Sequence, residues 1–482
     1  MADLFSHPSD GVHGGFDQSG WVGQGRGARA ICIVSEETET MGIHRVKVKL
    51  NRDGVLFGQR RNLTKPYALK GTHEFLSLLT EYIPSMSSEV HTDRRLFASA
   101  CGAQIEFIGA EKTNARSVFI AGDSTVADQY ASAEYYPFDS FAGWGQMLSC
   151  FLDQAAVCNM AHSGMTARCF AEDGHFGIVQ KYIKADDLLL IQFGHNDQKR
   201  RELQPHRLYT KYLGDIVDAA LKKGAQPVLL SPVSRVPGRD AAGTFDLLQL
   251  HAEAVHALAQ RRKLPFIDLH SYTFEKYCAM GESCRDLFKD MTHSNDPGAF
   301  AIARFVAQEL KRMGIAETSD AAAGFIESDR QKNPCRPVPS MLPVSYLDIG
   351  EIPDRQIVRE GVRCGLLDPC VLHMHPFEPL SRAEFIQKLF RAAGLKGKAT
   401  DGIAPYRDVN GREFDASYAA ACKSSGLVEG EYYRPDDMIS AAEVNEFMHR
   451  LGCQARLSGS KALPNRYELI KLLLAVKAER AS

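Results

Sequence analysis

Two short motifs in this 482-residue chain bring together a hydroxyl, a carboxylate and an imidazole. Ser124 follows the apolar run 117–121, so we expect it where a strand turns toward a helix. Asp290 and His293 are three residues apart, which lets the carboxylate on a turn accept a hydrogen bond from imidazole Nδ1. The imidazole then keeps Nε2 as a base for the serine, whose hydroxyl is a poor nucleophile until it loses its proton. The pair of motifs predicts acyl transfer through Ser124.

Two further segments supply hydrogen-bond donors. Asn196 closes the apolar run 187–193, at the carboxyl end of a predicted strand, where open α/β sheets bind ligands. Gly164 follows another short strand and offers a backbone N–H at a residue that permits close approach. With the N–H of Ser124, they predict three donors for an oxyanion, each contributing about 3 kcal/mol to transition-state stabilisation. Each motif alone is also typical of a capped helix start or a solvated loop, so the prediction depends on their combination.

The segment 117–314 has the pattern of alternating strands and helices. Four apolar runs are too short for typical helices and are bounded by turn residues: SVFIAG, DLLLIQFG, QPVLLSP and PFIDL. Strands separated by helices predict a parallel sheet with helices on both faces, an α/β fold.

The chain is longer than the roughly 250 to 300 residues at which one hydrophobic core stops growing, so we expect several domains. Residues 1–114 carry short alternating runs that predict a β-sandwich. Residues 115–332 form the predicted catalytic domain, and the Pro-rich stretch 333–343 is a predicted linker. In 344–482 three landmarks recur in order, which indicates an internal repeat: Tyr346-Leu347-Asp348 as Tyr406-Arg407-Asp408, Gly365-Leu366 as Gly426-Leu427, and Ser381–Glu384 as Ser440–Glu443.

Composition narrows the class of partner. The net charge is −2 and the sequence pI is about 6.8, so no overall field favours nucleic acid or an anionic membrane. The chain has no apolar run of membrane-spanning length, and its first residues lack the features of a signal peptide, which predicts a cytoplasmic protein. The 12 cysteines include no CxxC pair, which favours reduced thiols over a metal site. We expect no metal and no cofactor.

Four motifs follow one another in the chain, around Ser124, Gly164, Asn196 and the Asp290–His293 pair. With these motifs in this order, the chain resembles the SGNH hydrolase superfamily. FAGWGQML, NMAHSGMTARCF, QFGHND, SPVSR and DMTHSNDPGA are similar to the rhamnogalacturonan acetylesterase branch. The resemblance implies a three-layer, flavodoxin-like α/β/α hydrolase domain with Ser124 as nucleophile, Asp290 and His293 as orienter and base, and Gly164 and Asn196 in the oxyanion hole. It also implies that His195 lines the substrate site, although packing alone would also explain a histidine there.

The C-terminal region resembles S-layer homology repeats, through YLDI with PLSRAEF, YRDV with MISAAEV, and ALPNRYEL in a shortened third copy. The resemblance implies attachment to a cell-wall polymer, with Arg382 and Arg466 as its basic residues. The second copy has Ala441 instead, which removes a charge-assisted contact there. We therefore favour a structural or interaction module, and keep cell-wall binding, with a cell-wall location, as the alternative.

The function predicted from these motifs is a carbohydrate O-acetylesterase. Its partner is an acetylated oligo- or polysaccharide of pectic (rhamnogalacturonan-type) or xylan origin. Two alternatives remain: a lipase or thioesterase of the same superfamily, and a glycan-binding protein tethered by the C-terminal repeats.

Overall fold

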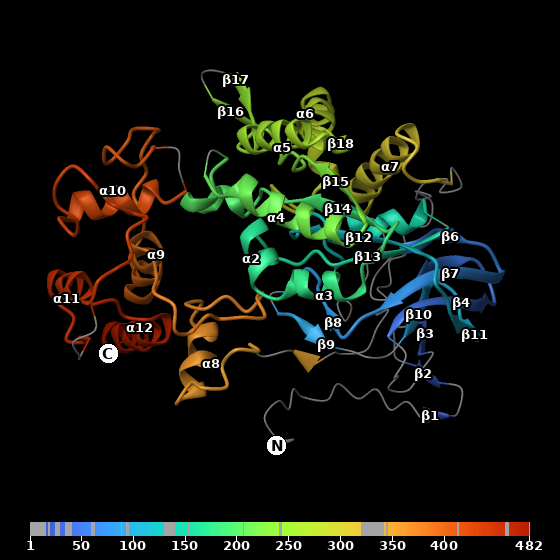
Figure 1. Cartoon of the computed structure of the whole chain (residues 1–482), viewed down its shortest axis with the longest axis horizontal. Coiled ribbons are helices and arrows are strands. Elements are labelled where there is room, and N and C mark those ends of the chain that lie inside the picture. The colour runs from blue at the N-terminus through green and yellow to red at the C-terminus, as the bar shows by residue number, and fades with distance from the viewer. Residues whose placement is uncertain are drawn as a thin grey trace. The chain divides into compact units, whose positions relative to one another are not determined.

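The computed structural model divides into two units (Figure 1). The first comprises residues 1–171, 175–194 and 212–344, and the second comprises residues 172–174, 195–211 and 345–482. The predicted sandwich and catalytic domain thus share one unit, while two short segments of the predicted catalytic domain belong with the C-terminal region. The structure describes residues 16–17, 20–24, 29–33, 41–58, 63–87, 89–92, 96–129, 140–152, 154–205, 207–240, 243–319, 342–343, 346–411, 414–457 and 462–481. Apart from residues 342–343, the predicted linker lies outside the described residues.

Two antiparallel sheets form at the start of the first unit. In β4, Val46, Val48 and Leu50 are buried and alternate with exposed lysines, as in a strand with one face in a core. They share one buried cluster with Leu56 and Ala98 of the other sheet. The assignment of 1–114 as a separate β-sandwich domain stays a prediction. The larger sheet contains β1 (Phe16–Asp17), β2 (Gly20–Gln24), β3 (Arg29–Ile33), β10 (Phe97–Cys101), β5 (Gly54–Phe57) and β6 (Leu63–Ala68); the smaller contains β11 (Ile105–Lys112), β4 (Gly42–Leu50) and β7 (Gly71–Leu79).

The predicted parallel sheet is confirmed. It has the order β13-β12-β14-β15-β18, with all neighbours parallel. Numbered along the chain, this is the order 2-1-3-4-5 of flavodoxin-like folds, whose ligand site lies at the carboxyl ends of the first and third strands. Those strands are β12 and β14, so the sheet predicts a site where they end. The strands are β12 (Arg116–Gly122), β13 (Ala155–Asn159), β14 (Leu188–Gln192), β15 (Gln226–Leu230) and β18 (Phe266–Ile267).

Both faces of this sheet are buried. Ile120 and Leu190 share a cluster with Trp144 of α1 and Val306 of α7 on one face. Their neighbours along each strand point to the opposite face and are fully or almost fully buried too. Among the described residues, no helix has the length and apolar character needed to cross a membrane. The helices of this segment are α1 (Trp144–Met147), α2 (Ala167–Glu172), α3 (His175–Tyr182), α4 (Tyr209–Lys222), α5 (Gln249–Arg262), α6 (Leu269–Met280) and α7 (Asp296–Arg312). A small sheet has the order β19 (Leu342–Pro343), β9 (His91–Thr92) and β8 (Tyr82–Ile83), and β16 (Gly238–Asp240) pairs with β17 (Gly243–Phe245).

The C-terminal part of the second unit is helical, and one set of contacts occurs in it twice. The carboxylate of Asp348 accepts the N–H groups of Met374 and His375 at 2.8 and 2.7 Å. The carboxylate of Asp408 accepts those of Tyr433 and Arg434 at the same two distances. The recurring YLD and YRD motifs therefore make the same backbone contacts. The helices are α8 (Arg355–Arg363), α9 (Arg382–Ala393), α10 (Ala416–Ser425), α11 (Ala441–Arg450) and α12 (Arg466–Ala481), around one hydrophobic cluster.

Residues 195–211, which follow β14, join this unit through charged contacts. Arg201 donates to the carbonyl of Asp408 and lies 3.6 Å from the carboxylate of Asp436. Arg207 contacts the same carboxylate at 2.5 Å. The side chain of Arg201 is 6% exposed, so Asp436 partly compensates a buried charge.

Candidate active site

Ser124 lies on the turn that follows β12, and this turn is rigidly held. The carboxylate of Asp123 accepts both the N–H and the hydroxyl of Thr125, at 2.9 and 2.7 Å. The hydroxyl of Thr125 accepts from Gln192 at the end of β14, and Gln192 accepts from the indole of Trp144. All four supporting side chains are buried, so Ser124 is fixed by a hydrogen-bonded chain across two strands. Asp123 thus fixes the turn through Thr125, and Trp144 packs in the hydrophobic cluster of this unit.

The Asp290–His293 turn brings a base to this serine. Ser124 Oγ lies 2.8 Å from His293 Nε2, and His293 Nδ1 lies 2.7 Å from Asp290 Oδ2. The other carboxylate oxygen, Asp290 Oδ1, accepts the N–H groups of Thr292 and His293, both at 2.7 Å. The structure therefore brings together three of the predicted catalytic side chains in a geometry suited to proton transfer from the hydroxyl.

The hydrogen bonds of Asp290 also set its charge. Its partial burial opposes ionisation, but the N–H and imidazole of His293 and the N–H of Thr292 stabilise the carboxylate, and its pKa is lowered. An ionised Asp290 favours the tautomer with hydrogen on Nδ1, which leaves Nε2 as the acceptor for the serine proton.

Gly164 belongs to the same unit, in the loop after β13. Its φ of +80° lies in the left-handed region, which glycine adopts without steric cost. The loop is anchored by His162, whose Nδ1 lies 2.8 Å from the N–H of Ser85. Burial lowers the pKa of His162, so this imidazole is a neutral structural acceptor. The place of the Gly164 N–H in an oxyanion hole stays a prediction.

Comparison with known proteins places this geometry in a family. Residues 120–299 match the GDSL-like Lipase/Acylhydrolase family. The chain is 34% identical over 216 residues to rhamnogalacturonan acetylesterase RhgT of Bacillus subtilis, covering 41% of this chain and 90% of RhgT. This chain belongs to the GDSL-like lipase/acylhydrolase family. The matched segment, residues 120–299, is therefore a carboxylic ester hydrolase domain.

Two further comparisons concern one protein of Bacillus subtilis. The GDSL-like chain is 33% identical over 221 residues to the uncharacterized esterase YxiM, covering 44% of this chain and 56% of YxiM. It thus spans little more than half the length of that relative. The crystal structure of YxiM is similar with a TM-score of 0.41 and 25% identity, covering 63% of this chain and 87% of that one.

The remaining predicted residues of the GDSL-like chain, His195 and Asn196, belong to the second unit. Within it, the side chain of His195 is buried. The amide oxygen of Asn196 lies 3.1 Å from Lys199 Nζ, an arrangement in which Lys199 orients the amide. The substrate contact of His195 and the oxyanion contact of Asn196 stay predictions.

Arg235 is a supporting residue that the sequence analysis did not assign. It lies in the SPVSR segment after β15, and its guanidinium donates to the hydroxyl of Thr292, inside the Asp290–His293 turn. Burial lowers the pKa of Arg235, while Asp123, Asp246 and Asp290 oppose that shift by their negative charge. The arginine thus supports the Asp290–His293 turn of the GDSL-like domain through Thr292. The sequence offered only the family resemblance of SPVSR as a signal.

Proposed function

We propose that this chain is a carbohydrate O-acetylesterase that acts on pectic (rhamnogalacturonan-type) or xylan-derived saccharides. The observation that carries the proposal is the 2.8 Å contact between Ser124 Oγ and His293 Nε2, which joins a nucleophile to a base oriented by Asp290. The similarity to RhgT, a rhamnogalacturonan acetylesterase, covers most of that relative and supports the acetyl ester as substrate.

The mechanism follows from the roles of the three side chains. His293 Nε2 takes the proton of Ser124 as Oγ attacks the acetyl carbonyl carbon, and a tetrahedral oxyanion forms. The imidazolium then protonates the sugar oxygen, the C–O bond breaks, and an acetyl-enzyme remains. Water activated by His293 attacks this ester, and acetate leaves with regeneration of the serine hydroxyl.

Three donors are assigned to the oxyanion in this proposal: the N–H groups of Ser124 and Gly164 and the side-chain amide of Asn196. Removing one such donor in other serine hydrolases costs on the order of 10² to 10³ in kcat. Asn196→Ala should therefore be milder than loss of the nucleophile, because two backbone donors remain.

Acetate release from a panel of acetylated pectin, xylan and oligosaccharides tests the proposal. We expect release from at least one of them, and Ser124→Ala or His293→Ala should lower kcat by about 10³ or more. Near-wild-type turnover in either variant, with circular dichroism showing a folded protein, would refute the assignment.

A p-nitrophenyl ester series separates this function from a lipase or thioesterase. Each methylene that finds no apolar contact forgoes about 0.8 kcal/mol of burial, so activity should fall from acetyl to butyryl and nearly vanish at octanoyl. Preference for octanoyl over acetyl would make this a lipase-like enzyme.

A further inference from the structure

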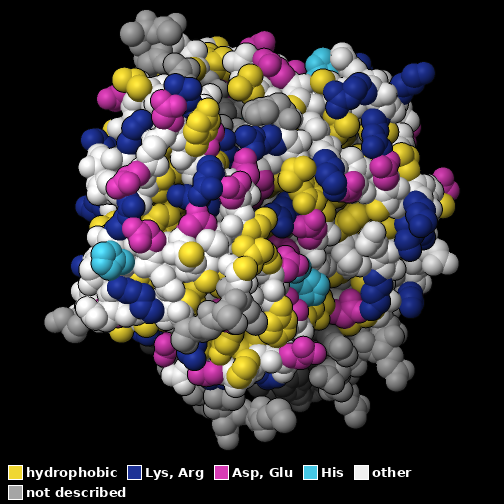
Figure 2. All heavy atoms as spheres, turned by 60° about the vertical axis from the view of Figure 1, so that its left-hand side comes forward, with side chains coloured by type: hydrophobic (Ala, Val, Ile, Leu, Met, Phe, Trp, Pro, Cys, Tyr) yellow, Lys and Arg dark blue, Asp and Glu magenta, His cyan; other side chains and the backbone are white. Residues whose placement is uncertain are grey.

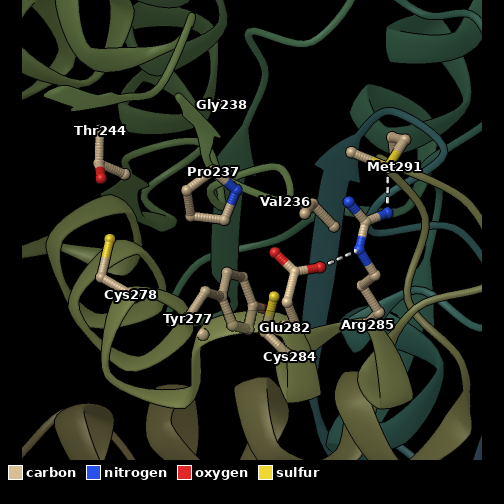
Figure 3. Close-up of a pocket in the computed structure, with 11 residues that line it drawn as sticks. Val236, Pro237, Gly238, Thr244, Tyr277, Cys278, Glu282, Cys284, Arg285 and Met291 are labelled. Atoms are coloured by element: carbon tan, nitrogen blue, oxygen red, sulfur yellow. Dashed lines mark hydrogen bonds and ion pairs between the residues drawn. The ribbon is translucent and has the colours of Figure 1, made fainter. Parts of the chain in front are cut away.

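A cavity of about 280 Å³ lies beside the Asp290–His293 turn (Figure 3). Met291, which stands between Asp290 and Thr292 in the chain, forms part of its wall. The other walls come from the segment after β15, from β17, from the end of α6 and from the turn that carries Glu282 and Arg285. Every lining residue belongs to the first unit.

Two contacts join this cavity to the catalytic turn. The N–H of Val236 donates to the carbonyl of Met291 at 3.2 Å. Arg285 Nη1 lies 3.0 Å from the sulfur of Met291 (Figure 3). Because Met291 and His293 are two residues apart, their Cα atoms are separated by at most about 7.6 Å. A molecule in the cavity therefore contacts the turn that carries the imidazole, through Met291.

The lining favours hydroxyl groups. Arg285 Nε donates to the carboxylate of Glu282 at 3.0 Å, and both side chains are largely exposed to the cavity and the solvent. The guanidinium can only donate and the carboxylate can only accept, while the hydroxyl of Thr244 can do both. Sugar hydroxyls, which donate and accept, match this set, and Val236, Pro237 and Met291 offer apolar surface to the C–H groups of a ring.

The charges argue against two other occupants. The Glu282–Arg285 pair has no net charge, so an anionic sugar would gain at Arg285 and meet repulsion at Glu282. A long acyl chain would remove water from both ions and return no hydrogen bond, which is costly. We infer that the cavity is a subsite for an uncharged sugar unit of the substrate, next to the acetylated one; this inference rests on the proposed function.

The test compares a substrate that reaches the subsite with one that does not. KM is measured for an acetylated xylo-oligosaccharide and for p-nitrophenyl acetate, in the wild type, Arg285→Met and Thr244→Val. The KM for the oligosaccharide divided by the KM for p-nitrophenyl acetate should rise about tenfold in Arg285→Met. This is the effect of losing about 1.4 kcal/mol of hydrogen bonding by a charged group. A rise of about threefold is expected in Thr244→Val, whose lost hydrogen bond is neutral.

Arg312→Met is the matched control. Arg312 pairs with Glu309 three residues earlier, as Arg285 pairs with Glu282, but it lies at the end of α7 and does not line the cavity. Its KM ratio should equal that of the wild type.

The outcomes separate this inference from the proposed function. Absence of acetate release from every acetylated substrate overturns the proposed function and the subsite with it. Release with an unchanged KM ratio in both cavity variants, or with the same rise in Arg312→Met, overturns the subsite alone. A larger Arg285→Met effect on uronate-containing than on neutral oligosaccharides would overturn the assignment to an uncharged sugar.

Discussion

Asp290 divides its two oxygens between two tasks. Oδ1 accepts two backbone N–H groups and so closes the turn, while Oδ2 contacts the imidazole. The same residue therefore shapes the loop and fixes the tautomer of His293. One carboxylate can take both roles because the aspartate and the histidine are three residues apart on one turn.

Asp290→Asn should lower kcat by about 10⁴, because an amide in place of the carboxylate favours the wrong imidazole tautomer. Steady-state kinetics with p-nitrophenyl acetate measure this loss of kcat. Asp286→Asn is the control, since Asp286 is an exposed carboxylate four residues earlier in the chain. Equal losses in the two variants would contradict the orienting role.

Arg235→Met should lower kcat by about tenfold to a hundredfold, because small displacements of a catalytic group have effects of this size. KM for p-nitrophenyl acetate should stay near the wild-type value, since the guanidinium acts through Thr292. Thr292→Val removes the other side of the same hydrogen bond, so the double variant should be no worse than the more impaired single variant. Fully additive losses would show that the two residues act separately.

At the scale of elements, the sheet order decides where chemistry is possible. β12 and β14 are hydrogen-bonded neighbours, so the turn after β12 carries Ser124 and Gln192 at the end of β14 supports it. The next residues after β14 lead into segment 195–211, which belongs to the second unit through Asp408 and Asp436. Loop residues of the C-terminal region thus contact the segment that carries Asn196.

Asp436→Ala should loosen this segment, since it removes the carboxylate shared by Arg201 and Arg207. Asp436 is 49% exposed, so we expect the free energy that holds the segment in place to fall by about 1 kcal/mol. If the segment positions Asn196, kcat should fall about fivefold. Hydrogen exchange of residues 195–211 and acetate release measure the two effects.

The control for this variant is Asp437→Ala, because Asp437 is an exposed neighbour that pairs with Arg434 instead. In an Asn196→Ala background, Asp436→Ala should cause no further loss of kcat. An undiminished fivefold loss there would mean that the segment does not act through Asn196.

Two basic residues of the C-terminal region pair with carboxylates of the same region. Arg382 is 6% exposed and hydrogen-bonds to Glu443, and Arg466 contacts Glu384 at 2.6 Å. These are the two basic residues that the S-layer resemblance assigns to a wall polymer. On the face drawn in Figure 2, basic and acidic side chains are interspersed. Both observations favour a structural module.

Glu384→Gln should destabilise the second unit by about 3 kcal/mol, because it leaves Arg466 and Lys388 without their shared anion. Burial opposes ionisation of Glu384, but Arg466 and Lys388 outweigh it and lower its pKa to about 2. A lowered pKa stabilises the fold above the ordinary value near 4.5 and loses this effect as the pH falls toward 2. The difference between wild type and variant should therefore shrink from pH 7 to pH 3, as measured by hydrogen exchange in α9.

Glu446→Gln is the control for that experiment. Glu446 is 53% exposed and pairs with Arg450 on the surface of α11, so its loss should leave the stability of the unit nearly unchanged at every pH. A pH-independent difference between wild type and Glu384→Gln would show that the charge of Glu384 is not what stabilises the unit.

Features that depend on local spacing and periodicity can be predicted from the sequence. Short apolar runs between turns predicted the parallel strands, since a strand buried on both faces needs such a run. Three-residue spacing predicted the contact between Asp290 and His293, because one turn is enough to form it. The recurring Tyr-x-Asp motifs likewise indicate a repeat, because each aspartate makes the same two backbone contacts.

Contacts between residues far apart in the chain arise only from the packing of the folded protein. Ser124 and His293 are 169 residues apart, and only the order of the strands brings Oγ within 2.8 Å of Nε2. The contact of Arg235 with Thr292, the cavity beside Met291 and the attachment of 195–211 to Asp436 have no periodic signal in the sequence. Each results from segments that meet only once the hydrophobic clusters have packed, because a side-chain contact between distant segments requires no fixed spacing along the chain.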